Sequence, residues 1–150
     1  MAHSTKRQSG FTIVELLIVI VVIGILAALV ITTFTGIQQK ARDTERQTDI
    51  KAIYGQVEAY YAQNGKYPAL TDLNTASWRT TNMKGLDQEA LRDPKNNTAN
   101  KYDLANAAAS SVYAYVVTPA GCDNSTTDCA AYTLTATLEA GGTFTKTNLN

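Results

Sequence analysis

One carboxylate stands out because of the residues around it. Glu15 lies inside a run of 21 residues, 11–31, in which every residue other than Thr12 and Glu15 is apolar or glycine. As a helix this run would be about 30 Å long, which matches the hydrocarbon core of a bilayer. An ionisable group in such a span is costly and usually functional, so Glu15 is the first candidate functional residue.

Ordinary explanations of this run compete with a functional one. A secretory signal peptide would have an apolar region of about 7–15 residues, followed by a small-residue cleavage site. Here the small residue, Gly10, precedes the run instead. A plain single-pass anchor has no use for a carboxylate five residues into the span. A further alternative is that the carboxylate of Glu15 only snorkels to the nearby interface.

The residues on the two sides of Gly10 resemble those of a known family. The segment KRQSG at residues 6–10, followed by FTIVE at 11–15, is similar to the class III leader and mature N-terminus of type IV pilins and type II secretion pseudopilins. The resemblance implies that a prepilin peptidase cuts between Gly10 and Phe11 and methylates the new amine of Phe11. It also implies assembly, through a platform protein and an ATPase, into a filament of copies of this chain.

Removal of the leader would give Glu15 a partner. Phe11 would carry an α-amino group four residues from Glu15, a spacing that puts the two groups on one face of a helix. An unpaired carboxylate in hydrocarbon is strongly penalised. We therefore expect Glu15 to act in assembly, by pairing with the Phe11 amine of an already assembled neighbour and setting the axial register of a filament.

The chain offers little for catalysis. Its single histidine, His3, lies in the expected leader, 1–10. The mature protein would therefore have no Ser-His-Asp or Cys-His catalysis and no histidine-ligated zinc. Neither the phosphate-loop motif nor the dinucleotide-binding glycine motif occurs. The prediction is a protein that is not an enzyme and has no catalytic residue, metal centre or cofactor.

A short loop near the C-terminus is bounded by two cysteines. Cys122 and Cys129, in an exported domain, predict one disulfide; the alternative is free or redox-active thiols, although there is no C-x-x-C motif. The intervening residues 123–128 are rich in oxygen atoms of the kind that calcium prefers, but they lack EF-hand spacing. We expect a polar turn closed by the disulfide, with calcium binding as the alternative.

A long helix must position the N-terminal groups. No proline occurs between residues 32 and 61, and an apolar stripe runs from Ile50 to Tyr61. Asn64-Gly65 then gives a helix stop. The sequence predicts one helix over 11–63, with 11–33 as the transmembrane or filament-core part and 34–63 as its amphipathic continuation. Charges that alternate between residues 40 and 51 indicate either a solvated face or bridges to neighbouring subunits.

The remaining residues, 64–150, predict a small globular head. Short helices are expected to start at 71–73 and at 87–91, and Trp78 is expected to pack on the core. Strands are expected at 112–117, 132–139 and 143–146, the last two joined by the Gly141-Gly142 turn. The fold class is therefore α+β, with the long helix covering one face of a small antiparallel sheet.

The preferred function is that of a structural subunit of a type IV pilus, a surface filament for adhesion, twitching motility or DNA uptake. The alternatives are a type II secretion or competence pseudopilin and, from another class, a membrane-anchored module that uses Trp78 to bind a ligand. The expected location is a single-pass precursor in the inner membrane with a cytoplasmic N-terminus, and then an extracellular pilus or a periplasmic pseudopilus. Removing Lys6 and Arg7 leaves 11 basic against 13 acidic residues, a net charge of −2, so no specific nucleic-acid binding is expected.

Overall fold

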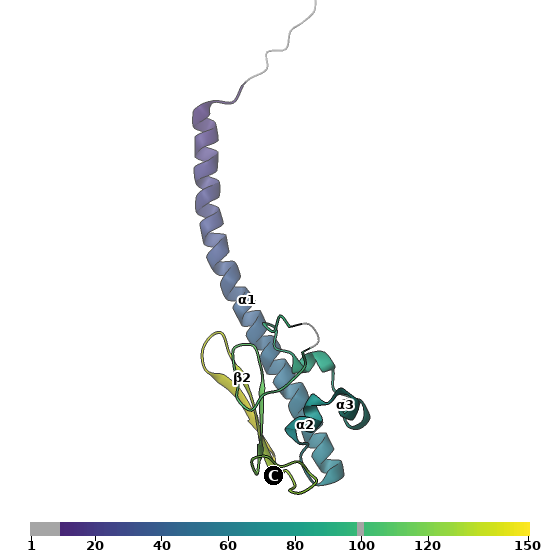
Figure 1. Ribbon diagram of the computed structural model, residues 1–150. Coiled ribbons are helices and arrows are strands. Elements are labelled where there is room, and N and C mark those ends of the chain that lie inside the picture. Colours follow the sequence, from purple (N-terminus) through teal and green to yellow (C-terminus); the bar gives the residue numbers. More distant parts are fainter. Residues whose placement is uncertain (1–9, 99–100) are drawn as a thin grey trace, which may run out of the picture. The chain divides into compact units, whose positions relative to one another are not determined.

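The computed structural model describes residues 10–98 and 101–150, without the side chain of Thr32. The expectations for Lys6, Arg7 and the rest of the leader up to Ser9 lie outside these residues. The described chain divides into two compact units, Met1–Gln38 and Gln39–Asn150. Helix α1 (Ile13–Asn64) runs through both units, and the second unit also holds every other helix and strand (Figure 1).

Helix α1 has 52 residues, which confirms the expectation of one long helix within two residues at each end. Its first part is apolar on all sides, and such a helix is stable only when its surroundings are apolar as well. Its end is set by Gly65, whose backbone φ of +71° is the left-handed conformation that glycine adopts without strain. The Gly65 N–H donates to the Tyr61 carbonyl at 2.8 Å, and this closes the last turn.

The sheet of the second unit has three antiparallel strands in the order β1-β2-β3. They are β1 (Ala114–Thr118), β2 (Ala131–Thr137) and β3 (Thr143–Thr147). The β2–β3 hairpin turns at two glycines with positive φ, Gly141 at +98° and Gly142 at +79°, as the glycine pair predicts. An α+β fold with a long helix and a small antiparallel sheet is confirmed.

Between α1 and the sheet lie short helices: α2 (Leu70–Asn74), α3 (Ala76–Asn82) and the 3-10 helix η1 (Gln88–Leu91). Helix α3 was not predicted from the sequence. Helix α2 starts one residue earlier than expected, because the Asp72 carboxylate accepts a bond from the Ala69 N–H at 2.9 Å and thereby fixes the first turn. The start of η1 is as expected, since Asp87 caps the N–H of Glu89 at 3.0 Å.

The core of the second unit lies between the later part of α1 and the inner face of the sheet (Figure 1). Alternate residues of β2, namely Tyr132, Leu134 and Ala136, are buried, as strict polar–apolar alternation predicts. The helix contributes a stripe that includes Ile50, Ile53 and Val57, each 0% exposed. Trp78 packs on the edge of this core with its ring centroid 5.1 Å from that of Tyr60, which confirms its expected packing role.

Candidate functional site

The N-terminal end of α1 is held by a reciprocal pair of hydrogen bonds between Thr12 and Glu15. The Thr12 N–H and hydroxyl both donate to Glu15 Oε2, at 2.9 Å and 2.6 Å, and the Glu15 N–H donates to Thr12 Oγ1 at 3.2 Å. This is a capping box, in which a Thr and a Glu three residues later satisfy N–H groups that the first helical turn leaves free. The signal in the sequence is Thr-x-x-Glu ahead of an apolar run, and this capping role of Glu15 was not predicted.

The capping box leaves part of the Glu15 carboxylate available. Both bonds to the carboxylate use Oε2, and among the described residues no hydrogen bond to Oε1 is found. Phe11 lies next to the box and its side chain is 87% exposed. The structure thus brings Phe11, Thr12 and Glu15 to one end of the helix, with Gly10 directly before them.

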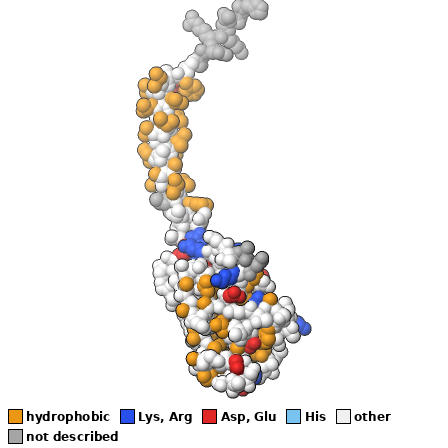
Figure 2. Space-filling model, in the orientation of Figure 1, with side chains coloured by type: hydrophobic (Ala, Val, Ile, Leu, Met, Phe, Trp, Pro, Cys, Tyr) orange, Lys and Arg blue, Asp and Glu red, His pale blue; other side chains and the backbone are white. Residues whose placement is uncertain are grey.

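The side chains of the first unit point outward along the helix. Between Phe11 and Ile37, 18 large apolar residues are 48–87% exposed, and hydrophobic side chains cover the visible face of this part of α1 (Figure 2). In the part of the chain that the structure describes, α1 is the one helix long and apolar enough to cross a membrane by length and composition. Such a surface needs an apolar environment, either lipid or other helices.

The alternating charges between residues 40 and 51 do not all lie on the solvated or intersubunit face that was expected. Asp43 is 6% and Arg46 is 0% exposed, so the expectation of a solvated or intersubunit face is wrong for these two residues. Arg46 donates to Asp93 at 2.8 and 3.1 Å, to Asp43 at 2.8 Å and to Glu139 at 3.0 Å. The turn after β2 is tied to the same cluster, because the N–H groups of Glu139 and Ala140 donate to Asp43 at 2.8 and 2.9 Å.

These contacts stabilise the charged forms of Glu139 and Arg46. The Arg42 guanidinium, which binds Glu139 at 2.6 and 2.8 Å, is the main cause that holds the pKa of Glu139 far below its usual value. The bonds that Arg46 donates to the Asp93 carboxylate likewise raise the pKa of Arg46. The cluster therefore joins α1, the segment after η1 and the β2–β3 turn within one subunit. It ties these elements of the second unit together.

The disulfide between Cys122 and Cys129 is confirmed. Within the loop that it closes, the backbone N–H groups of Thr126 and Ser125 donate to Asp123 and lower the pKa of its carboxyl to about 2. The Lys66 ammonium donates to Asp128 at 2.9 Å and to the Asn124 carbonyl at 3.0 Å. The calcium alternative stays a prediction, and an ion would have to displace donors from both carboxylates.

Comparison with known proteins addresses the N-terminal end directly. The family model described as "Prokaryotic N-terminal methylation motif" matches residues 5–31, a range that includes Gly10, Phe11, Thr12 and Glu15. The N-terminal region of this chain therefore carries this methylation motif and is similar to the matching segments of pilins and pseudopilins. The capping box lies within the matched range.

Individual relatives match this chain over part of its length. The chain is 41% identical over 63 residues to "Type II secretion system core protein G" of Aeromonas hydrophila, which covers 42% of this chain and 44% of the relative. It is 38% identical over 66 residues to the protein of the same name in Escherichia coli (strain K12), 44% of this chain and 46% of that protein. It is 38% identical over 67 residues to "Type IV major pilin protein PilA" of Myxococcus xanthus (strain DK1622), 45% of this chain and 30% of that protein.

The similarity has a clear limit. The matched segment spans less than half the length of these curated relatives, and no solved structure gives a significant match. The comparisons therefore show similarity over part of the chain, including the motif at residues 5–31, whereas the architecture of the head rests on the structure described here.

Proposed function

We propose that this protein is a structural subunit, not an enzyme, that polymerises through helix α1 into a filament of the type IV pilus or pseudopilus class. The single observation that carries the proposal is the exposed apolar surface between Phe11 and Ile37, joined to a methylation motif. Burying one large apolar side chain stabilises by roughly 1.5–3 kcal/mol. Eighteen such residues give a driving force that the monomer alone leaves unused.

The precursor would rest in the inner membrane until assembly. The length and composition of α1 support insertion, and the basic pair Lys6 and Arg7 supports a cytoplasmic N-terminus. A prepilin peptidase would cut after Gly10 and methylate Phe11. An assembly ATPase acting through a platform protein would then transfer the subunit from lipid to the filament.

Glu15 would guide this transfer. The capping box occupies Oε2, so Oε1 can accept a bond from the Phe11 amine that cleavage creates. Because a carboxylate is costly in an apolar environment, a neighbour that supplies this amine lowers the free energy of the assembled state. The contact would fix the axial position of each added subunit.

Pairing of Glu15 with the Phe11 amine is compatible with both a type IV pilus and a pseudopilus. We put the type IV pilus first, as a surface fibre for adhesion, motility or DNA uptake, and its support is the similarity to the Myxococcus xanthus pilin. The similarity to several type II secretion core G proteins favours the second candidate, a pseudopilus subunit of the cell envelope. Long surface fibres in micrographs of cells that express the protein would support the first.

The N-terminus of the protein from its native cells tests the proposal. Mass spectrometry should find a peptide that begins with N-methylated Phe11, and electron microscopy should find filaments that contain the protein. An intact leader together with a monomeric protein would contradict the proposal. That result would instead support a membrane-anchored binding module.

A further inference from the structure

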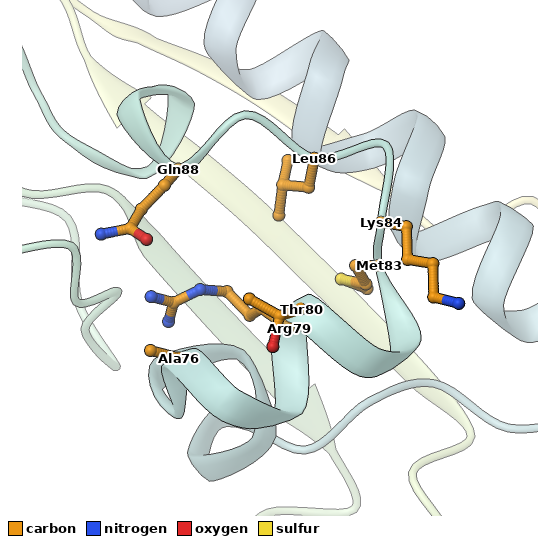
Figure 3. A pocket seen from close by; sticks show the side chains of 7 residues that line it. All are labelled: Ala76, Arg79, Thr80, Met83, Lys84, Leu86 and Gln88. Atoms are coloured by element: carbon orange, nitrogen blue, oxygen red, sulfur yellow. The ribbon is translucent and has the colours of Figure 1, made fainter.

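A hollow in the head is lined by α3 and the segment that follows it. Its volume is about 320 Å³. The lining consists of one short side chain at the start of α3, two apolar side chains and four polar or charged ones (Figure 3). They are Ala76, Arg79, Thr80, Met83, Lys84, Leu86 and Gln88.

Arg79 is the unusual member of this lining. Its side chain comes from α3, and the residue is 7% exposed. Its Nη1 atom donates to the Leu73 carbonyl at 2.5 Å. In the described parts of the chain it has no ion-pair partner within 4.0 Å, and the residues outside those parts include no Asp or Glu.

The charge of Arg79 is therefore uncompensated at close range. Burial lowers its pKa, and the first opposing influence is Asp103, which acts at a distance. An arginine nevertheless keeps its proton in a protein. Burying such a charge without a partner is costly.

Comparison with Arg46 shows what is missing. Arg46 is buried even more completely, at 0% exposed, but it binds the carboxylates of Asp43, Asp93 and Glu139. Arg46 binds three carboxylates, whereas Arg79 donates to one carbonyl oxygen and otherwise lines the hollow. Every buried side-chain nitrogen and oxygen of the described residues has a partner, so the remaining guanidinium nitrogens of Arg79 reach the solvent in the hollow.

The other lining residues indicate the kind of ligand. The guanidinium of Arg79 and the carboxamide of Gln88 lie at the same side of the hollow, whereas the Lys84 ammonium points away from it (Figure 3). A planar guanidinium matches a carboxylate through two parallel bonds. Leu86 and Met83 offer apolar contact beside that position.

We propose that this hollow is a binding site for a small organic carboxylate, whose charged group pairs with Arg79 and whose short apolar chain lies against Met83 and Leu86. The Gln88 carboxamide donates a further bond to the carboxylate. A volume of about 320 Å³ is at the lower end of the range for ligand sites, so the ligand is a small molecule. Every residue that lines the site belongs to the second unit.

The test uses the full-length protein in detergent micelles, with butyrate as the probe. Butyramide has the same shape without the charge, and inorganic phosphate is an anion of different geometry. Titrations followed by NMR of the Arg79 guanidinium and Gln88 amide signals should show saturable shifts with butyrate, with a Kd of about 1 mM. Butyramide and phosphate should bind at least about tenfold more weakly.

Three variants assign the binding to this hollow. Arg79→Gln removes the charge, and Ala76→Leu fills the space while keeping the charge; each should weaken butyrate binding at least about tenfold. Ala76 is exposed, so its variant stays informative if Arg79→Gln fails to fold. Arg92→Gln is the matched control and should leave butyrate binding unchanged. Arg92 is another arginine of the head, and it lies 3.6 Å from Glu89.

Several results would overturn the proposal. These are no saturable shift with butyrate, equal binding of butyramide, tighter binding of phosphate, or full binding by the Ala76→Leu variant. Equal weakening by Arg92→Gln would also overturn it, because the effect would then come from the overall charge of the head.

Discussion

The two parts of helix α1 use one continuous backbone for different purposes. Residues 13–38 expose apolar side chains, and Glu15 is the single charged residue among them. Residues 39–64 bury an apolar stripe, and they also bury Arg46 among carboxylates of the same chain. The first part is therefore built for partners outside the chain, and the second for partners inside it.

The charged groups illustrate this difference most sharply. Arg46 finds all its partners within the head, so its charge contributes to one folded subunit. Glu15 finds only Thr12, a neighbour in the sequence, and keeps one carboxylate oxygen without a described partner. Substitutions in the two parts should accordingly affect different measurements, and the predictions below test this separation.

The largest effect is expected at Glu15. Glu15→Lys places a second positive charge beside the Phe11 amine and should reduce the amount of filament more than about tenfold, because the pairing is replaced by repulsion in an apolar environment. Glu15→Ala should also reduce it, but less. Filament yield is measured by shearing cells and quantifying the subunit in the sheared fraction.

The same variants should leave the head unchanged. Thermal unfolding of the head, followed by the fluorescence of Trp78, should match that of the wild type. If both variants assembled as well as the wild type, the pairing would play no part in assembly. A destabilised head would contradict the separation of the two parts of α1.

The second prediction concerns Arg46. Arg46→Met keeps much of the side-chain volume but leaves Asp43, Asp93 and Glu139 without their shared cation. The free energy of unfolding of the head should fall by about 3–5 kcal/mol, measured by urea unfolding of the full-length protein in detergent. Membrane insertion of α1 should persist.

Arg42→Gln is the matched control for Arg46→Met. Arg42 also binds Glu139, but its side chain is 27% exposed, so solvent can replace the lost bonds. Its effect on unfolding should be clearly smaller. An equal effect would show that burial of Arg46 adds nothing to the stability of the head.

The third prediction concerns Asp49, which accepts a bond from the Tyr113 hydroxyl at 2.8 Å. Burial raises the pKa of Asp49 from 3.8 to about 6, and Glu45, Asp93 and Asp87 add to the rise. Because the folded pKa of Asp49 lies above its unfolded value, this carboxyl contributes stability that is fully present near pH 4 and is lost as the pH rises through 6. The gain should be about 2 kcal/mol, allowing for partial exposure.

Asp49→Asn isolates this contribution. The amide oxygen still accepts the Tyr113 bond but carries no charge, so the variant should be more stable than the wild type at pH 7. The difference between the two should disappear near pH 4. If urea unfolding gave a difference independent of pH between 4 and 7, the carboxyl of Asp49 would not titrate in this range.

Local signals in the sequence predicted much of the fold. The helix stop at Gly65, the hairpin at Gly141-Gly142 and the alternation in β2 all depend on neighbouring residues, and all were confirmed. The two distant partners of Arg46 were not predicted, because Asp93 and Glu139 lie 47 and 93 residues away in the sequence. Burial of Arg79 was missed for the same reason, since it depends on how α3 packs.

The residues of the N-terminal site were predicted from the sequence, but one of the two roles of Glu15 was not. The sequence placed Gly10, Phe11 and Glu15 together, but it assigned Glu15 only an intermolecular role. The structure adds the bonds to Thr12, which the spacing of three residues already allowed. A carboxylate can thus serve the helix start and the assembly contact together, because it has two oxygens.

Thr12 gives the smallest expected effect and separates these two roles of Glu15. Thr12→Val removes the hydroxyl that caps the N–H of Glu15, which should destabilise the first turn of α1 by about 1 kcal/mol. Thr12→Ser keeps the hydroxyl and is the control. Amide hydrogen exchange at residues 13–16 of the micelle-bound protein should rise in Thr12→Val and not in Thr12→Ser. Because Oε1 of Glu15 stays available in both, filament yield should change far less than in Glu15→Ala. An equally large loss of filaments in Thr12→Val would mean that the capping box itself, and not the free oxygen, is what assembly requires.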